Sequence, residues 1–240
     1  MQLQTYNNPR SNISEAYRLI RTNIEYSNID KELKTILITS SQPNEGKSTV
    51  ISNLAATFAS LENKKVLIID CDLRNPSVHK MFHISNLVGI TDILTGQKKI
   101  EECIEKTKID NLHLLKVGKR PPNPSEMLQS KKMREFIELI RDYYDYIFID
   151  SPPVGVVADA SVLAQYCDGT ILLVSANEVD IEATKISKER LERVNANILG
   201  AVLNKFDVSE AGYGYYSYYY YGEKENNNKK KSKFTLFNRK

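Results

Sequence analysis

The ten residues 40–49, Ser-Ser-Gln-Pro-Asn-Glu-Gly-Lys-Ser-Thr, constrain the fold of this chain more than any other segment. An apolar run at 35–39 precedes them, and the sequence predicts a helix over 50–60 after them. A strand, a tight loop, Gly-Lys-Ser and a helix form the layout of a phosphate-binding loop, where backbone amides and the helix N-terminus favour an anion. We therefore expect Lys47 to reach the β- and γ-phosphates of a nucleotide and Ser48 to ligate Mg²⁺.

The match to the pattern G-x-x-x-x-G-K-[ST] departs at Ser41, where the pattern has glycine. Serine is small enough to let a phosphate approach, and Asn44 tolerates a left-handed backbone better than most non-glycine residues. The alternative is a strand-to-helix turn with a chance Gly-Lys-Ser. The interpretation as a phosphate-binding loop places Lys47 in an exposed loop. It assigns these nucleotide-binding residues: Ser41, Gln42, Pro43, Asn44, Glu45, Gly46, Lys47, Ser48 and Thr49.

The size and charge of the chain limit the other possibilities. A length of 240 residues with 41% apolar content suits one large α/β domain. Three widely spaced cysteines argue for a reducing compartment and against a zinc site or a disulfide framework. We expect a cytosolic or peripheral protein, since no signal peptide and no apolar run of the ~20 residues needed to span a membrane is present.

The positive charge is concentrated near the C-terminus. The chain has a net charge of +3, but residues from 222 onward hold seven basic and two acidic residues, which leaves 26 basic and 28 acidic residues in the body. Nothing in this mildly acidic body suggests a nucleic-acid-binding face.

Apolar runs and helical periods alternate along the chain. After a loose leader at 1–11, we predict a helix over 12–27 with Asn12 as its N-cap, and residues 75–110 read as irregular to helical. The predicted strands are 35–39, 65–70, 112–117, 146–150, 169–174 and 199–204, and the further helices are 50–60, 125–144, 158–166 and 180–194. This alternation predicts a mostly parallel sheet covered by helices on both faces, with ligands at the carboxyl ends of the strands. We assign 1–206 to this domain and 207–240 to a flexible tail.

Two predicted strands end in acids that could complete a nucleotide site. The first leads into Asp70-Cys71-Asp72-Leu73-Arg74 and the second into Asp150-Ser151-Pro152-Pro153. A single aspartate at a strand end is common, but the phosphate-binding loop and both acidic segments occur in order at βα spacing. Together they predict a site for ATP and Mg²⁺.

These three segments resemble the Walker A, A′ and B motifs of bacterial tyrosine kinases (BY-kinases) of the CpsD/CapB type, which regulate capsular and exopolysaccharide synthesis. Nearly the whole chain shares the resemblance, including Pro122-Asn123-Pro124-Ser125-Glu126, the pattern Glu15-x-x-Arg18-x-x-Arg21 and a terminal tyrosine cluster. ParA/MinD-like ATPases share the Walker motifs but usually carry a second lysine early in the loop, where this chain has Gln42. The resemblance implies a P-loop NTPase fold of the MinD/ParA type.

The resemblance also implies an ATP- and Mg²⁺-dependent protein-tyrosine kinase. Lys47 would neutralise phosphates, while Ser48 would ligate Mg²⁺ directly and Asp72 and Asp150 through its water shell. Asp70 is our candidate for accepting the phenolic proton, with Asp72 as the alternative. Asn204 either contacts the adenine edge or is a turn residue. The expected autophosphorylation sites are Tyr213, Tyr215, Tyr216, Tyr218, Tyr219, Tyr220 and Tyr221.

Partners follow from the same resemblance. Glu15, Arg18 and Arg21 match the family's oligomerisation motif, which implies a ring, an octamer in the family, although such a stripe is otherwise an ordinary solvated face. A membrane adaptor of the polysaccharide chain-length type would recruit the cytoplasmic kinase to the inner face of the membrane, and a tyrosine phosphatase would oppose it. The basic end at 229–240 either rests on anionic lipid or only solubilises the tail. The alternative functions are a ParA/MinD-type ATPase that acts through nucleotide-driven dimerisation and a nucleotide-bound scaffold without catalysis.

Overall fold

A seven-stranded sheet forms the centre of the computed structural model, which describes residues 3–27 and 32–207. The strand order is β3-β4-β2-β5-β1-β6-β7, and all neighbours pair in parallel except β3 and β4, which are antiparallel. The strands are β1 (Thr35–Ser40), β2 (Val66–Asp70), β3 (Ile104–Lys106), β4 (Leu112–Leu115), β5 (Tyr146–Asp150), β6 (Gly169–Ser175) and β7 (Ile198–Asn204). The predicted, mostly parallel α/β fold is confirmed, and β3 is an edge strand that the sequence analysis missed.

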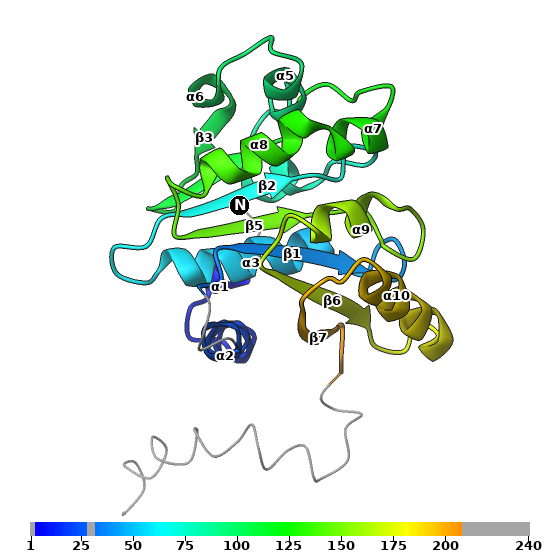
Figure 1. The fold of residues 1–240 in the computed structure, drawn as a ribbon. Coiled ribbons are helices and arrows are strands. Elements are labelled where there is room, and N and C mark those ends of the chain that lie inside the picture. Colours follow the sequence, from blue (N-terminus) through cyan, green and yellow to red (C-terminus); the bar gives the residue numbers. More distant parts are fainter. Residues whose placement is uncertain (1–2, 28–31, 208–240) are drawn as a thin grey trace, which may run out of the picture. The chain divides into compact units, whose positions relative to one another are not determined.

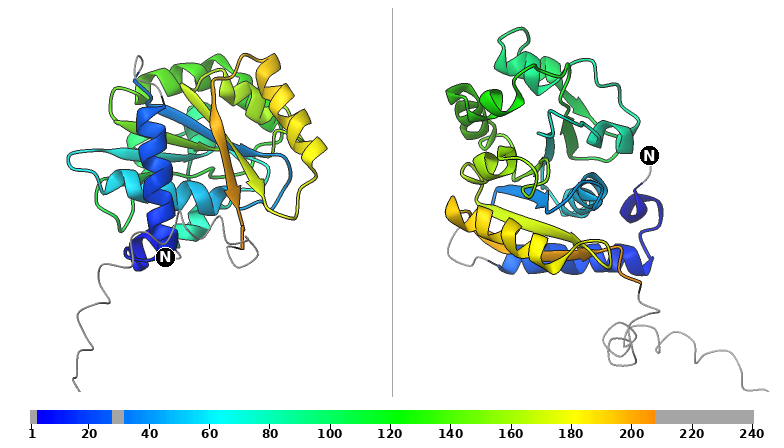
Figure 2. Two further views of the ribbon diagram at one scale, coloured as in Figure 1. Left: turned by 90° about the horizontal axis from the view of Figure 1, so that it is seen from below. Right: turned by 90° about the vertical axis from the view of Figure 1, so that its right-hand side faces the viewer.

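Helices connect the strands and cover both faces of the sheet (Figure 1). They are α1 (Gln4–Asn7), α2 (Asn12–Tyr26), α3 (Lys47–Ala59), α4 (Val78–Phe82), α5 (Ile90–Leu94), α6 (Ile100–Cys103), α7 (Pro124–Gln129), α8 (Lys131–Ile140), α9 (Asp159–Ala164) and α10 (Ile181–Arg193). Figure 2 shows α8, α9 and α10 on one side of the sheet and α1, α2 and α3 on the other.

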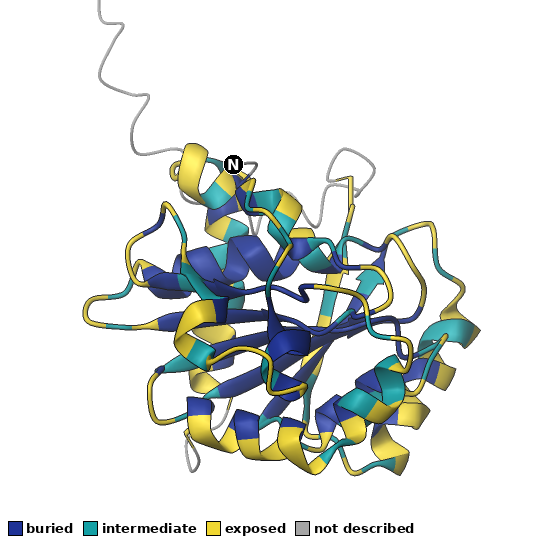
Figure 3. Cartoon of the chain, turned by 90° about the horizontal axis from the view of Figure 1, so that it is seen from above, coloured by how far each residue is buried: buried dark blue, intermediate teal, exposed yellow. Residues whose placement is uncertain are grey.

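Alternate residues of the buried strands supply two separate hydrophobic cores. In β1, Leu37 packs with residues of α7 to α10, whereas Ile36 and Ile38 pack with Leu3 and residues of α2 to α4. Successive side chains of a strand point to opposite faces, so a continuous apolar run is buried on both sides. Every residue of β1 and β2 is buried, as the dark centre of Figure 3 shows. This double burial fixes the strand register and therefore the position of the residues at the strand ends.

Two expectations about the N-terminal region are wrong. Residues 3–11 of the leader are not loose, because Leu3 is fully buried in the core and Thr5 donates hydrogen bonds from its amide and its hydroxyl to Asn53 of α3. The cap of α2 is Ser11, not Asn12: the Ser11 hydroxyl accepts a hydrogen bond from the Ser14 amide at 3.2 Å. An N-cap needs a non-helical backbone, and Ser11 has the extended conformation.

The helix predicted over 125–144 is interrupted at one residue. Ser130 has φ −64° and ψ 150°, which ends α7, and its hydroxyl then accepts from the Met133 amide to begin α8. The serine side chain offers the backbone an alternative to continuing the helix. The remaining predicted elements occur with ends shifted by a few residues.

The C-terminal segment lies mostly outside the described residues. Backbone proximity divides the chain into a unit of residues 1–204 and a second of residues 205–240, of which only 205–207 are described. The seven tail tyrosines and the basic end therefore lie outside the described residues. None of the described helices is both long enough and apolar enough to cross a membrane.

Candidate active site

The loop between β1 and α3 has the backbone of a phosphate-binding loop. Gly46, the N-cap of α3, has φ 97°, and Asn44 has φ 64°, so both occupy the left-handed region that the sequence suggested for Asn44. A Cβ at Gly46 would stand 2.4 Å from the side-chain nitrogen Nδ2 of Asn204, so the Asn204 side chain would have to move. Only glycine avoids both the backbone strain and this clash.

Lys47 is buried, which corrects the expectation of an exposed loop lysine. It is the first residue of α3 and is 8% exposed, and its Nζ donates to the Ser40 hydroxyl at 3.0 Å. Burial lowers the pKa of Lys47, and the negative charges of Asp150 and Asp72 oppose that shift. The ammonium group is therefore held beside the loop and the acidic residues. There, the negative charge of a nucleotide's phosphates would offset the free-energy cost of its burial.

Ser48 and Asp150 form the second part of the site. Because β5 lies directly beside β1, the end of β5 brings Asp150 next to the loop, and the Ser48 hydroxyl donates to its Oδ2 at 2.6 Å. The Oδ1 atom of the same carboxylate is buried and has no partner among the described residues. Burial raises the pKa of Asp150 to about 7, against the opposing effects of the Ser48 hydrogen bond and the Lys47 charge.

Ser77 is a residue of this site that the sequence analysis missed. Its hydroxyl lies 2.6 Å from the Ser48 hydroxyl, and its backbone amide donates to Oδ2 of Asp70 at 3.1 Å. No local sequence signal marked it, because it lies in the region predicted as irregular to helical.

Asp70 and Asp72 take different positions after β2. Asp70 pairs in register with Asp150, is fully buried, and accepts from the amides of Asp72, Ser77 and Val78. Burial and the charge of Asp150 raise the pKa of Asp70 well above its usual range. Asp72 is only half-buried, and its charge contributes to the pKa shifts of Lys47, Asp70 and Asp150. The three predicted carboxylates therefore gather at one end of the sheet.

The oxygen atoms of this site suit Mg²⁺ bound together with a nucleotide better than they suit a metal ion held only by protein side chains. Among the described residues, no group of three or more His, Cys, Asp or Glu side chains could hold a metal ion. The site instead offers the hydroxyl of Ser48 and the unpartnered Oδ1 of Asp150. Mg²⁺ typically binds one or two carboxylates and substrate phosphates and keeps several waters. These oxygen atoms therefore fit a nucleotide-bound Mg²⁺.

Two polar residues brace the loop from the neighbouring strands. The buried carboxylate of Glu45 accepts from the amides of Gln42 at 2.6 Å and Ser175 at 2.7 Å, so it ties the loop to the end of β6. Asn204, the last residue of β7, donates to the Glu45 carbonyl at 2.7 Å. Asn204 is thus an internal support of the loop. Ser41 is also buried, and its hydroxyl has no partner among the described residues.

The proposed oligomerisation residues on α2 have unequal surroundings. Glu15 and Arg18 form an exposed ion pair with each other. Arg21 is mostly covered, because its guanidinium donates to the Thr57 carbonyl of α3 at 2.7 Å. The stripe is therefore a solvated face only in its first two residues.

Comparison with known proteins places this geometry among related enzymes. The AAA domain family matches residues 33–179. The tyrosine-protein kinase YwqD of Bacillus subtilis is 42% identical over 209 residues, with 87% of this chain and 88% of the relative covered. The putative tyrosine-protein kinase CapB of Staphylococcus aureus is 37% identical over 216 residues, with 90% and 94% covered. CpsD of Streptococcus pneumoniae is 39% identical, with 85% and 89% covered.

Solved structures give the same picture. The chimerical protein CapA2B2 superposes with a TM-score of 0.82 at 34% identity, covering 85% of this chain and 89% of the other. The kinase domain of the Escherichia coli tyrosine kinase ETK gives 0.81 at 33% identity, covering 85% and 80%. MinD of Pyrococcus horikoshii, complexed with Mg-ADP, is more distant, with 0.63 at 26% identity and 74% and 72% covered.

Proposed function

The chain belongs to the CpsD/CapB family of bacterial tyrosine-protein kinases, and from this premise we propose that it transfers the γ-phosphoryl group of ATP to tyrosines of its own C-terminal segment. The observation that carries the proposal is the pairing of the Ser48 hydroxyl with Asp150, whose second carboxylate oxygen is buried without a partner. Such an arrangement at the end of a phosphate-binding loop suits phosphoryl transfer.

The residues of the site have separate roles in this proposal. Lys47 neutralises charge on the β- and γ-phosphates, and the backbone N–H groups of residues 44–49 hold the phosphate chain. Ser48, Asp72 and Asp150 would hold Mg²⁺. When bound, this ion would neutralise part of the negative charge of the phosphates. Positioning and electrostatics dominate because the transition state of phosphoryl transfer is loose.

Two carboxylates compete for the phenolic proton. The raised pKa of Asp70 suits a base, but its three backbone donors and full burial restrict access to it. Asp72 is half-buried and more accessible. We retain Asp70 as the first candidate and Asp72 as the second. The pH dependence of the rate in Asp70→Asn and Asp72→Asn would distinguish them, because only loss of the base should remove the acidic limb.

The position of the tail in the sequence supports phosphorylation in trans. The segment 213–221 starts nine residues after the end of β7, so a tail is constrained in reaching its own site repeatedly. We propose that a ring formed through Glu15, Arg18 and Arg21, an octamer in the resembling family, presents each tail to a neighbour. Each phosphate adds about −1.5 to −2 charges, so the modified tails repel one another and the ring loosens.

The proposal includes the cellular setting. A membrane adaptor of the polysaccharide chain-length type would activate the kinase and recruit it to the inner face of the membrane, where it regulates capsular or exopolysaccharide synthesis. A tyrosine phosphatase would reverse the modification. The two components in the name of the CapA2B2 chimera are compatible with an adaptor-partnered kinase.

A mixing experiment tests the kinase and the trans mechanism together. A Lys47→Met chain with an intact tail is incubated with ATP, Mg²⁺ and an active chain whose seven tail tyrosines are replaced by phenylalanine. Labelled Lys47→Met protein is the expected result. If neither chain is labelled while the unmodified protein labels itself, transfer occurs within one chain. ADP formation without phosphotyrosine in the unmodified protein would favour a MinD-type ATPase instead.

A further inference from the structure

Arg74, Ser125 and Asp159 form a closed polar cluster beside the candidate active site. The Arg74 guanidinium donates through Nε to Oδ2 of Asp159 at 2.8 Å and through Nη2 to Oδ1 at 3.3 Å. Nη2 also donates to the Ser125 hydroxyl at 2.8 Å, and that hydroxyl donates to Oδ1 of Asp159 at 2.6 Å. Each member of the cluster therefore contacts both others.

The burial of Asp159 separates this cluster from an ordinary surface ion pair. The Asp159 side chain is 0% exposed, while that of Arg74 is 42% exposed. The hydrogen bond to Asp159 raises the pKa of Arg74 above its usual value. Moving Arg74 away would leave the buried charge of Asp159 uncompensated, which is energetically costly. The pair therefore strongly favours the geometry in which the two side chains are in contact.

The cluster joins segments that belong to different parts of the site. Arg74 follows Asp72 by two residues, with the fully buried Leu73 between them. Asp159 begins α9, and Ser125 lies in α7, which packs against α9 on the same face of the sheet (Figure 1). Arg74 therefore fixes the acidic segment after β2 to the helix that follows Asp150.

The segment leading from Asp150 to Asp159 also touches the phosphate-binding loop. The amide of Val154 donates to the Ser40 carbonyl at 2.9 Å, and a Cβ at Gly155 would lie 2.1 Å from the Ser41 carbonyl. The contacts thus form a continuous chain from the phosphate-binding loop, through residues 151–159, to Arg74 and from there along the backbone to Asp72. Without the Arg74–Asp159 contact, no side-chain hydrogen bond among the described residues would connect residues 151–159 to the segment after β2.

We propose that Arg74, held by Asp159 and Ser125, is a positioning residue that sets the acidic segment of residues 70–72 at its working distance from the phosphate-binding loop. This inference rests on the proposed function. Arg74 touches neither ATP nor tyrosine in this proposal, and the hydrogen bonds of the phosphate-binding loop do not involve it. Its loss should therefore slow phosphoryl transfer more than it weakens nucleotide binding.

The test compares Arg74→Ala with the parent in the full-length protein. We expect kcat to fall roughly 10- to 100-fold, the size of effect that misplacement by about 1 Å can cause. The affinity for a fluorescent ATP analogue should change less than about threefold. Asp159→Asn should lower kcat similarly, and the double variant should be no worse than the worse single variant, since both break one contact.

The matched control is Arg141→Ala, which breaks another two-pronged arginine–aspartate pair, with Asp168, at the opposite end of the sheet. It should lower thermal stability and leave kcat unchanged. Unchanged kcat in Arg74→Ala, equal losses in affinity and kcat, or additive effects of Arg74→Ala and Asp159→Asn would each overturn the proposal.

Two further measurements keep the outcome decisive. If Arg74→Ala does not fold, Ser125→Ala removes one donor and should lower kcat about two- to fivefold; no change would count against the cluster. Turnover is followed as both phosphotyrosine and ADP. A parent that forms ADP without phosphotyrosine would overturn the kinase assignment, while the comparison of Arg74→Ala with the parent by ADP formation would still decide the role of Arg74.

Discussion

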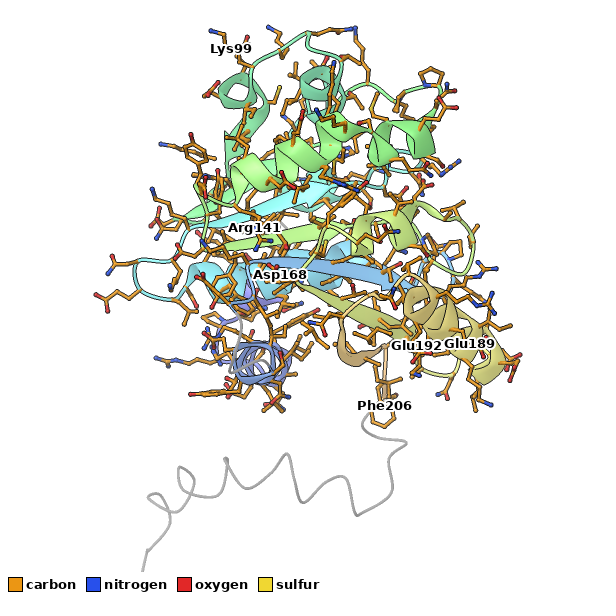
Figure 4. The ribbon with its side chains drawn as sticks, in the orientation of Figure 1. Lys99, Arg141, Asp168, Glu189, Glu192 and Phe206 are labelled. Atoms are coloured by element: carbon orange, nitrogen blue, oxygen red, sulfur yellow. The ribbon has the colours of Figure 1, made fainter. Side chains whose placement is uncertain are left out.

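Two aspartates at opposite ends of the sheet have opposite environments. Asp168, just before β6, accepts hydrogen bonds from the amides of Lys34 and Thr35, the Thr35 hydroxyl and two nitrogens of Arg141. Figure 4 shows Arg141 and Asp168 next to each other. Asp150, at the end of β5, has one hydroxyl donor on Oδ2 and a buried, unpartnered Oδ1.

The difference appears in their ionisation. Burial alone would raise the pKa of Asp168, but the hydrogen bonds from Arg141, Thr35 and Lys34 hold it below its usual value. Burial raises the pKa of Asp150 to about 7, because Ser48 and Lys47 offset only part of the desolvation. Both carboxylate oxygens of Asp168 accept hydrogen bonds, and these bonds join Arg141 to the start of β1. Asp150 has an unpartnered Oδ1, which can still bind a ligand. Asp168 thus lies at the amino ends of the strands, which we call the structural edge, and Asp150 at their carboxyl ends, which we call the reactive edge.

The largest expected effect at the reactive edge comes from Lys47→Met. We expect the rate of tyrosine phosphorylation to fall at least about 100-fold, since a preorganised charge on the transferring phosphoryl group is lost. The melting temperature should change little, because the variant removes a desolvated ammonium group. Lys34→Met, at the structural edge, is the control and should label normally. A Lys47→Met protein that phosphorylates a tyrosine-bearing chain would show that the phosphate-binding loop is wrongly assigned.

Asp150→Asn should separate activity from stability. We expect phosphorylation to fall about 100-fold, while the nucleotide-free protein becomes more stable at pH 7, because the variant removes a carboxylate whose pKa burial raises to about 7. Chemical denaturation without Mg²⁺ or nucleotide measures the second effect. A loss of stability at pH 7 would mean that the carboxylate is better satisfied than the contacts show.

Asp168→Ala should do the reverse. It leaves Arg141 and two backbone amides without their acceptor, so we expect unfolding free energy to fall by about 2–3 kcal/mol. At a temperature where the variant is folded, kcat and the affinity for ATP should stay within about twofold of the parent. A large fall in kcat of the folded variant would show that the two edges are coupled, contrary to the separate roles assigned to Asp150 and Asp168.

The sequence already distinguished these two edges. Asp150 follows the apolar run 146–149, whereas Asp168 precedes the run that begins at 169. In a parallel sheet, the order of acid and apolar run tells which edge the acid occupies, and ligands bind at the carboxyl edge. The same reasoning located Asp70 and Asp72. Long buried runs therefore predicted both the central strands and the edge at which the candidate site lies.

Other features depend on contacts between distant segments or on short polar pieces. Strand β3 has only three residues, two of them charged, so neither length nor alternation marked it. The burial of Lys47 and the pairing of Arg74 with Asp159 required three-dimensional packing, because the latter residues are 85 positions apart. The break at Ser130 lay within a continuous helical pattern. Local propensity cannot reveal interactions that tertiary packing selects.

Per pH unit, the smallest expected effect on stability is a difference in pH dependence between the two edges. The raised folded-state pKa of Asp150, about 7 against an ordinary 3.8, means that the folded protein holds more protons between these values. Stability contributed through this group is therefore lost as pH rises from about 4 to 7, by at most about 1.4 kcal/mol per pH unit. Asp168 has a lowered pKa, so its contribution is present above 3.8 and is lost only as pH falls through the folded value.

A difference between variants isolates this effect from other titrating groups. His79 and His113 have lowered pKa values because of burial, so they make stability rise with pH in part of the same window. Subtracting the curve of Asp150→Asn from that of the parent removes the histidine contributions. The difference, parent minus variant, should become more negative from pH 4.5 to 7, whereas the difference for Asp168→Asn should be flat there. Parallel curves for the parent and Asp150→Asn would contradict the raised pKa. They would also remove the difference in pKa between Asp150 and Asp168, because ionising the buried carboxylate of Asp150 would then cost no more free energy in the folded than in the unfolded protein.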